Sequence, residues 1–262
     1  MIKKTANIAD SEIIWASNFM SNNKFFFLPL IKKVQLTNEV WSFYFKRTGE
    51  EPDFKPGQYY EMKLDIKNPD ERGDSRVFTI CSSPTEKEYV MFTTKIIESS
   101  FKKTLLNLSL GTIVQFDGPW DDLDVNLDDP SPKIFFAGGI GITPFHSILK
   151  YCVDSNLNLP IILFASWQMR SDVLFHEFFR ETEEKLSAFT YVPTISQEQE
   201  DFDWNGVRGR IDQSVIERHV VKKDLATYYI VGPERFLKGI EEILLGMRIS
   251  QEKIFAESFS GY

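Results

Sequence analysis

The sequence contains little cysteine and histidine: two cysteines and three histidines in 262 residues. Cys81 and Cys152 form no C-x-x-C pair, which excludes an iron–sulfur cluster or a cysteine-based zinc site built by this sequence. They also give no disulfide framework, which favours a reducing compartment, the cytoplasm. The histidines are widely separated and lack the spacing of metal ligands, so we expect no metal site.

Long apolar runs and an excess of basic residues are also missing. The longest apolar stretches, residues 25–31 and 160–165, are far too short to span a bilayer. Polar residues follow the first four residues, which is unlike a signal peptide. The net charge is -8, which argues against nucleic-acid binding because that affinity comes mainly from Lys and Arg. We therefore expect neither a membrane span nor a nucleic-acid partner.

The composition that remains is that of an ordinary globular protein. Hydrophobic residues make up 42% and charged residues 26% of the chain, which argues against wholesale disorder. The length favours one large or two medium domains.

The first half of the chain consists of short runs rich in Phe, Leu, Val and Tyr that are punctuated by Gly, Pro and Asp. Such spacing is typical of an antiparallel β-barrel or sandwich. We expect strands at residues 25–36, 39–46, 58–64, 77–80, 89–97 and 112–116. One helix is expected over residues 101–108, because Ser99 and Ser100 can cap its start.

The second half alternates short apolar runs with helical patterns, which predicts a parallel sheet of βαβ units. Strands are expected at residues 133–137, 161–165, 190–194 and 228–231, and helices at 144–151, 172–186, 212–219 and 233–245. The linker-like residues 128–132, Asp-Asp-Pro-Ser-Pro, place the domain boundary between the halves. The expected units are an N-terminal extension (a short helix or a loose arm), a β-barrel domain and an α/β domain, over residues 1–24, 25–130 and 131–262.

Polar and apolar residues alternate over residues 122–128. The polar positions have the spacing of a calcium loop, but Leu127 stands where such a loop requires glycine. The alternation predicts a strand instead.

A glycine-rich stretch at residues 138–144, Gly-Gly-Ile-Gly-Ile-Thr-Pro, follows an expected strand and opens an expected helix. Glycines there let the backbone approach a pyrophosphate, and the helix N-terminus supplies amides. Thr143 suits the N-cap and Pro144 the first helical turn. The stretch departs from the standard dinucleotide fingerprint, because Pro144 replaces the third glycine and no acidic residue ends the next strand. A purely structural turn is the alternative.

Residues 76–84 form the most unusual stretch of the first half. Arg76 on a strand can pair with a phosphate, and Phe78 projects to the same face of that strand. Thr79 points to the other face and can offer a hydroxyl to a ring nitrogen. Taken alone, an arginine beside an aromatic residue is better explained as a surface charge next to a core side chain.

Taken in order, the motifs resemble those of the ferredoxin-NADP reductase superfamily of flavoproteins. The family's flavin motif, Arg-x-Tyr/Phe-Ser/Thr, matches residues 76–79, and its nucleotide motif, Gly-Gly-x-Gly-Ile-Thr-Pro, matches residues 138–144. Further matches are Pro-Gly-Gln-Tyr at 56–59, Ser-Ser-Phe-Lys at 99–102, Gly-Pro at 118–119, Val-Gly-Pro at 231–233 and Glu-Ser-Phe at 257–259. The resemblance implies a two-domain fold, with an FAD-binding antiparallel barrel followed by an NAD(P)-binding α/β domain.

The resemblance also assigns residues to the flavin. Arg76 would bind a flavin phosphate, Phe78 would lie against the isoalloxazine ring, and Thr79 would hydrogen-bond near its N5. The start of the expected helix and the strand before it would add contacts from Ser99, Ser100, Phe101 and Lys95.

The nucleotide NAD(P)H would bind to the second domain, against Gly139, Gly141, Thr143, Gly232 and Pro233. Glu257 would assist proton movement near N5, and Phe259 would cover the flavin and give way to nicotinamide. Together with Thr79, these last two residues form the catalytic set that the resemblance implies.

The function implied is that of an NAD(P)H-dependent flavoprotein reductase, which transfers a hydride between NAD(P)H and FAD. Electrons would pass to a separate partner, a small redox protein such as ferredoxin or flavodoxin. A flavin-binding subunit of a larger complex and a free-flavin reductase are the alternatives. Gln168 stands where many members carry an arginine for the 2′-phosphate, and Arg170 follows, so both nucleotides stay open with NADH slightly favoured. The role of Tyr262, as a gating ring or as an interface or tail residue, also stays open.

Overall fold

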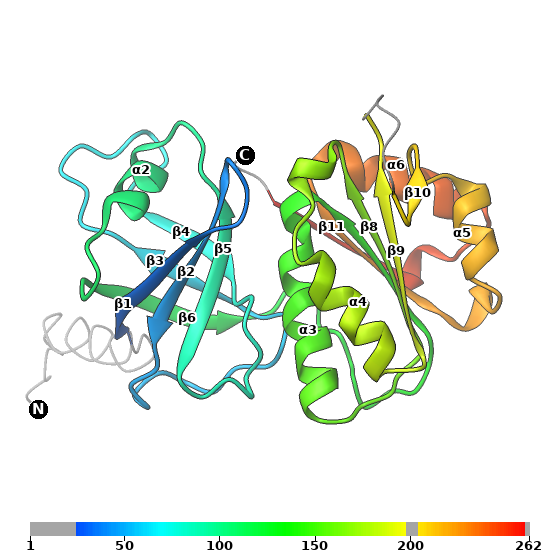
Figure 1. The fold of residues 1–262 in the computed structure, drawn as a ribbon, viewed down its shortest axis with the longest axis horizontal. Helices are drawn as coiled ribbons and strands as arrows, with labels where there is room; N and C mark the ends of the chain where they lie inside the picture. The colour runs from blue at the N-terminus through cyan, green and yellow to red at the C-terminus, as the bar shows by residue number, and fades with distance from the viewer. Residues whose placement is uncertain (1–24, 198–203, 260–262) are drawn as a thin grey trace, which may run out of the picture.

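The computed structural model describes residues 25–197 and 204–259, which form two domains side by side (Figure 1). Each domain is built around its own six-stranded sheet. The expected N-terminal extension, residues 1–24, and Tyr262 lie outside the described residues. The predicted fold class, an antiparallel barrel followed by a parallel α/β domain, is confirmed.

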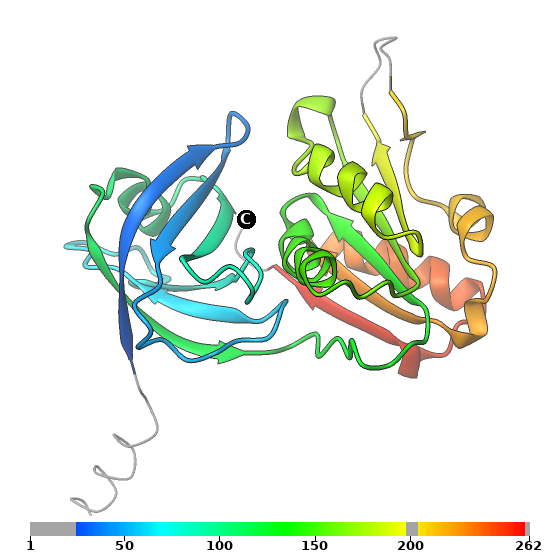
Figure 2. The ribbon, with the colours of Figure 1, turned by 60° about the horizontal axis from the view of Figure 1, so that its bottom comes forward.

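The N-terminal sheet is antiparallel, with the strand order β4-β3-β6-β1-β2-β5 (Figure 2). Its strands are β1 (Phe26–Gln35), β2 (Val40–Lys46), β3 (Tyr59–Lys63), β4 (Ser75–Thr79), β5 (Tyr89–Lys95) and β6 (Ile113–Trp120). Just past β4, the Cys81 amide donates to the Met91 carbonyl of β5 at 2.7 Å. This bond joins the two outer strands and closes the barrel.

Alternating side chains fill the barrel. Along β1, Phe26, Leu28 and Leu30 are buried, whereas Phe27 between them is exposed. This is the period-two pattern of a strand with one face on the core. Helix α2 (Ser100–Asn107) packs against the same core.

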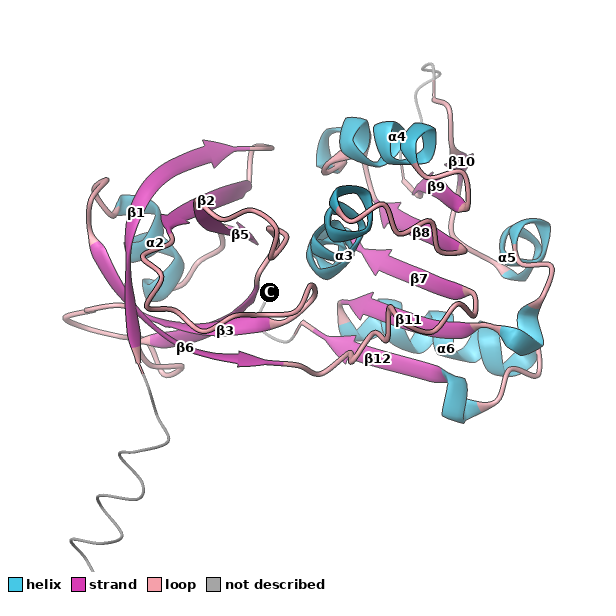
Figure 3. Cartoon of the chain, turned by 90° about the horizontal axis from the view of Figure 1, so that it is seen from below, coloured by secondary structure: helices cyan, strands magenta, loops and turns pink. Residues whose placement is uncertain are grey.

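The C-terminal sheet is parallel, with the strand order β10-β9-β8-β7-β11-β12 (Figure 3). Its strands are β7 (Lys133–Gly138), β8 (Ile161–Trp167), β9 (Phe189–Ile195), β10 (Val207–Arg208), β11 (Thr227–Gly232) and β12 (Ile254–Ser258). Helices α3 (Thr143–Asp154) and α4 (His176–Lys185) cover one face, and α5 (Gln213–His219) and α6 (Glu234–Gly246) cover the other. Burial on both faces explains why the central strands are continuous apolar runs. Over the ranges 25–197 and 204–259, no helix has the length and apolarity needed to cross a bilayer.

The connection from β6 to β7, residues 121–132, is a loop that passes between the domains (Figure 2), so the strand predicted over 122–128 is wrong. Its polar side chains bond to the loop itself, since the Asp121 carboxylate accepts from the Asp124 amide at 2.8 Å. Such local bonds compete with strand pairing. The apolar alternation arises because Leu123 is buried against the core of the α/β domain.

Helix α3 begins at Thr143, so the prediction that Thr143 is the N-cap is wrong. The N-cap is Ile142, and Pro144 follows Thr143 in the first turn. The Thr143 hydroxyl donates back to the Ile140 carbonyl at 3.2 Å. The preceding 3-10 turn runs directly into the helix, so no side-chain cap forms there.

Strands β10 and β12 were also not predicted.

Candidate functional site

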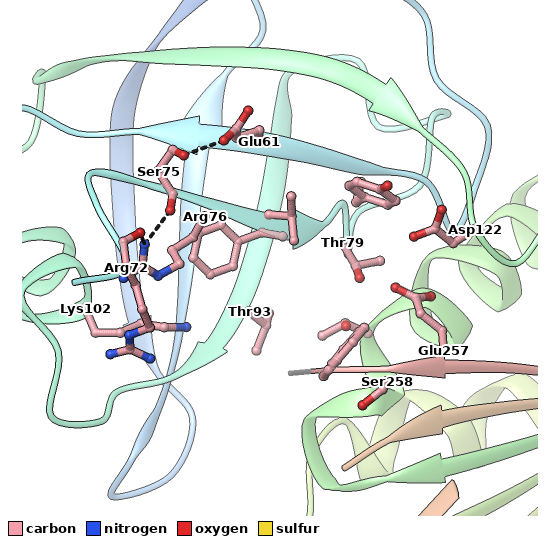
Figure 4. A pocket seen from close by; sticks show the side chains of 15 residues that line it. Glu61, Arg72, Ser75, Arg76, Thr79, Thr93, Lys102, Asp122, Glu257 and Ser258 are labelled. Carbon is pink, nitrogen blue, oxygen red and sulfur yellow. Dashed lines mark hydrogen bonds between the residues drawn. The ribbon is translucent and has the colours of Figure 1, made fainter. Parts of the chain in front are cut away.

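A cleft between the two domains collects side chains from both (Figure 4). Its volume is about 470 Å³, which lies in the range of small-molecule sites. The barrel lines it with Tyr59, Glu61, Arg72, Ser75, Arg76, Val77, Phe78, Thr79, Thr93 and Lys102, the connecting loop with Asp122, and the α/β domain with Thr143, Glu257, Ser258 and Phe259. The predicted site residues that the cleft brings together are Arg76, Phe78, Thr79, Thr143, Glu257 and Phe259.

Arg76 of β4 is held in a defined orientation at the barrel end of the cleft. Its guanidinium donates to the Arg72 carbonyl at 2.6 Å and lies 5.3 Å from the centre of the Phe101 ring. The Asp70 carboxylate pairs with it at 3.1 Å. Because the guanidinium fork suits phosphate as well as carboxylate, this group is already oriented for an anion.

Asp70 also bonds to the first residue of α2. Its carboxylate accepts from the Ser100 amide at 3.0 Å, and its own amide donates to the Ser100 hydroxyl at 2.9 Å. The bond from the Ser100 amide is the main cause that lowers the pKa of Asp70 to about 2, and Arg72 adds to this effect. The start of a helix beside an arginine favours an anion, and a carboxylate of the chain itself stands at this position.

Lys102 is a cation of the cleft to which the sequence assigned no role. Its side chain is buried, and its Nζ donates to the Thr94 hydroxyl and lies 4.7 Å from the centre of the Phe78 ring. Burial lowers the pKa of Lys102 to about 7, and the charges of Arg76 and Arg72 lower it as well. Only the folded barrel shows that this position of α2 faces the cleft.

Other predicted flavin contacts lie behind or away from the cleft lining. Lys95 is not among the lining residues, and its ammonium pairs with Glu39 at 2.6 Å. Ser99 caps α2 by accepting from the Lys102 amide at 3.0 Å. Phe101 is fully buried in the barrel core, and its ring packs against the Arg76 guanidinium.

The middle of the cleft is largely apolar. Phe78 turns into the barrel and packs 5.8 Å from the Phe101 ring, while Val77 and Thr79 share the opposite face of β4. Val77 is 62% exposed, which is unusual for a valine on a strand. Phe259 approaches from the α/β domain and lines the other side. This surface suits a flat ring system.

Glu257 and Asp122 lie near each other at the α/β end of the cleft (Figure 4). Burial raises the pKa of Glu257 to about 7, and the charges of Asp122 and Asp121 add to the rise. Burial and then the Asp122 carboxylate raise the pKa of Tyr59 to about 12. Glu257 therefore exchanges its proton near neutral pH, which is the property required of a general acid or base.

The glycine turn at residues 138–144 joins β7 to α3. Gly139 has a φ of +55°, and a side chain there would extend into open space. At Gly141, a Cβ atom would collide with the Val231 carbonyl, so this glycine lets the turn pack against the end of β11. Thr143 follows and lines the cleft. The backbone of the turn is thus accessible at Gly139, whereas at Gly141 it packs closely against the end of β11.

Strand β12 brings the last described residues to this turn. It runs parallel to β11 with Ser258 opposite Gly232, and the Phe259 amide donates to the Gly232 carbonyl at 3.1 Å. Pro233 follows Gly232 at the N-cap of α6. Open α/β sheets bind ligands at the carboxyl ends of their strands, and these residues lie at that edge.

The residues of the cleft fit FAD and a nicotinamide nucleotide. Arg72, Arg76 and Lys102 line the barrel end of the cleft, and a diphosphate requires such positive charge. Burial, and after it the charges of Arg76 and Arg72, lower the pKa of Lys102, and a bound anion at this end would favour its charged form. Open space at Gly139 leaves the backbone accessible to a second nucleotide. In the part of the chain that the structure describes, no group of three His, Cys, Asp or Glu side chains is placed to hold a metal ion.

Comparison with known proteins gives matches to both halves of the chain. Residues 135–242 match the family model of the oxidoreductase NAD-binding domain. The chain is 27% identical over 236 residues to the glycine betaine monooxygenase reductase subunit of Chromohalobacter salexigens, covering 87% of this chain and 62% of that protein. It is 24% identical over 208 residues to the reductase component of phenol 2-monooxygenase of a Pseudomonas species, covering 79% of this chain and 58% of that protein. The chain therefore spans less than two thirds of the length of either relative.

A solved structure shares the whole two-domain fold. The ferredoxin NADP+ reductase of Neisseria gonorrhoeae, with bound FAD and NADP, superposes with a TM-score of 0.76 at 17% identity, over 90% of this chain and 98% of that one. The domain match, the fold and the ordered motifs agree with one another. In its fold, its NAD-binding domain and the order of its motifs, the chain is therefore similar to the ferredoxin-NADP reductase superfamily of FAD- and NAD(P)-binding oxidoreductases.

Proposed function

We propose that the protein is an NAD(P)H-dependent reductase that holds FAD in the cleft and passes electrons to a separate protein. FAD is assigned to the barrel domain, residues 25–130, and NAD(P)H to the α/β domain, residues 131–262. The observation that carries this proposal is one cleft that combines three cations of the barrel with Glu257 and Phe259 of the other domain. Bound FAD supplies the conversion from a two-electron hydride donor to a one-electron acceptor.

The main polar and aromatic side chains of the cleft then have defined tasks. Arg72, Arg76 and Lys102 bind the diphosphate, and Thr79 orients the ring system with its hydroxyl. Phe259 covers the ring and excludes water, and Glu257 holds and moves a proton at its carboxyl oxygen. NAD(P)H is bound by the residues at the carboxyl edge of the parallel sheet, Gly139, Gly141, Thr143, Gly232 and Pro233.

The electron acceptor is proposed to be a small redox protein, such as ferredoxin or flavodoxin, or an oxygenase component. Both relatives are named as reductase parts of monooxygenases, which favours an oxygenase system and supports a second candidate, a subunit of a larger complex. Within these 262 residues there is no C-x-x-C pair for an iron–sulfur cluster, so we place any such cluster outside these residues. Cys81 and Cys152 are buried free thiols, and we place the protein in the cytoplasm.

An absorbance spectrum tests the proposed function directly. Purified protein is incubated with FAD or, in a parallel sample, with FMN, passed through a desalting column and examined for flavin bands. Anaerobic NADH or NADPH is then added, and we expect at least one of them to bleach those bands. Protein that retains neither FAD nor FMN would contradict the proposal. Bleaching by NADH and NADPH in parallel experiments also measures which nucleotide is preferred.

A second prediction concerns Lys102→Met, which is expected to weaken FAD binding and remove its pH dependence. The pKa of Lys102 is about 7 without a ligand, and a diphosphate favours the charged ammonium. Wild-type affinity should therefore be constant below pH 7 and fall by up to about tenfold per pH unit above it. FAD dissociation constants measured by titration at about pH 6 and about pH 8.5 check this, because the phosphates of FAD do not titrate in that range.

Lys103→Met is the matched control for Lys102→Met. Lys103 is the next residue of α2, and its exposed ammonium pairs with Glu98 at 2.7 Å. This variant should keep both the affinity and the pH dependence of the wild type. Equal wild-type affinities at the two pH values, or the same slope in Lys102→Met, would show that Lys102 does not contact the diphosphate.

A further inference from the structure

Helix α3 is joined to the barrel by two buried hydrogen bonds. The Ser147 hydroxyl donates to the Ser82 carbonyl at 2.7 Å, and His146 Nδ1 lies 2.8 Å from the Cys81 carbonyl oxygen. Ser147, Ser82 and Cys81 are fully buried, and His146 is nearly so. Because water does not compete at buried sites, these bonds are stronger than bonds on the surface.

The protonation state of His146 is fixed by its surroundings. A carbonyl oxygen only accepts, so Nδ1 must carry the proton of the neutral ring. Burial lowers the pKa of His146 to about 4, which keeps the ring neutral near pH 7. Phe175 and Phe178 lie against the ring, each with its centroid 4.3 Å from that of the imidazole. His146 therefore presents a rigidly held, uncharged donor to the barrel.

A second segment of the barrel meets the same turn of α3. The Gly57 amide lies 3.4 Å from the Ser147 hydroxyl oxygen, and a Cβ atom at Gly57 would stand 3.3 Å from Cδ1 of Ile148. Gly57 belongs to the Pro-Gly-Gln-Tyr stretch that leads into β3, and Tyr59 of β3 lines the cleft. The segments next to both β3 and β4 are thus in contact with one helix of the other domain.

The segments that these hydrogen bonds connect lie next to cleft residues of the two domains. The accepting carbonyls lie shortly after Thr79, the last residue of β4, and the donors lie shortly after Thr143, the first residue of α3. Thr79 and Thr143 line the cleft from opposite domains. We propose that His146 and Ser147 are positioning residues that fix β4 relative to the glycine turn at 138–144. This inference rests on the proposed function, since a hydride moves only between centres held about 3–3.5 Å apart.

The test compares Ser147→Ala, His146→Leu and His146→Asn. The asparagine amide stands as far along the side chain as Nδ1 and restores the donor, whereas leucine removes it. FAD content should stay near wild type, because no residue that binds FAD is changed. The melting temperature should fall by a few degrees at most in Ser147→Ala and His146→Leu, because each leaves a buried carbonyl without its donor. At saturating NAD(P)H, stopped-flow flavin reduction should slow by about 10- to 100-fold in Ser147→Ala and His146→Leu, and the KM for NAD(P)H should change by less than about threefold. His146→Asn should reduce at a rate near that of the wild type.

Thr85→Ala is the matched control for these variants. Thr85 bonds to Asp154 between the same loop and the same helix, but at the exposed end of α3. We expect its rate of flavin reduction to stay within about twofold of the wild type, because exposed contacts contribute little. Wild-type rates in Ser147→Ala and in folded His146→Leu, or a His146→Asn protein as slow as Ser147→Ala, would overturn the proposal. A wild-type protein that binds FAD but is not reduced by NAD(P)H would instead contradict the proposed function.

Discussion

Arg76→Ala protein is expected to lose its FAD on a desalting column that wild-type protein passes with FAD bound. The Arg76 side chain is 17% exposed, and a backbone carbonyl and the Phe101 ring orient its guanidinium toward the cleft. Removing one partner of a largely desolvated charge pair costs about 2–5 kcal/mol, which is roughly a 30- to 5,000-fold loss of affinity. The ratio of flavin to protein absorbance and the FAD dissociation constant measure this loss.

Two further variants separate the geometry of Arg76 from its charge. Arg76→Lys keeps the positive charge but loses the planar fork, so its affinity should lie between those of the wild type and the alanine variant. Lys63→Ala removes an exposed cation of β3 that pairs with Asp74 at 3.6 Å, and it should retain FAD fully. Full FAD content in Arg76→Ala protein would mean that the diphosphate does not bind at this end of the cleft.

The fold was predictable wherever the burial of an element leaves a regular pattern of apolar residues in the sequence. Strand β1 shows this with alternate buried residues, and β7 with a run that is buried throughout. Strand β12 could not be predicted, because Ile254 alone is buried in it and Phe255 is exposed. Its position comes from backbone pairing with β11, which leaves no periodic pattern in the sequence.

The candidate site was predictable only in part, for a similar reason. Arg76, Thr79 and Thr143 stand on strands or at a helix start that motifs mark in the sequence, and the structure brings them to one cleft. Arg72 and Asp122 come from loops whose conformation depends on local hydrogen bonds, so no spacing in the sequence connects them with the site.

The two lysines near the flavin motif illustrate the same limit. The sequence suggested Lys95 because it precedes the helix, but the structure pairs its ammonium with Glu39. Lys102, placed on α2, faces the cleft. Which lysine reaches the cleft is decided by how α2 packs onto the barrel, and sequence order does not contain that information.

Glu257→Gln is expected to slow NAD(P)H-driven electron transfer by about 100-fold or more and to abolish its pH dependence. A turnover that brings in a hydride and sends out two electrons leaves one proton in the cleft, and this proton must reach solvent. The Glu257 carboxylate can accept it only when ionised, and the pKa of this group is raised to about 7 by burial and by Asp122 and Asp121. The wild-type rate should therefore rise with pH and level off above about pH 7.

The source of the raised pKa can be tested in the same assay, with ferricyanide as a one-electron acceptor. Asp122→Asn removes a negative charge that raises the pKa of Glu257, so the midpoint of the pH–rate curve should move to lower pH. Glu252→Gln changes an exposed carboxylate just before β12 and should leave the curve unchanged.

A Glu257→Gln enzyme with the wild-type curve would remove Glu257 from the proton path. A midpoint that rises in Asp122→Asn would show that the two carboxylates do not repel each other across the cleft. Glu257 lies opposite Val231, one residue before the pair of Gly232 and Ser258, so the pairing of β12 with β11 places this proton acceptor beside the residues assigned to the nucleotide.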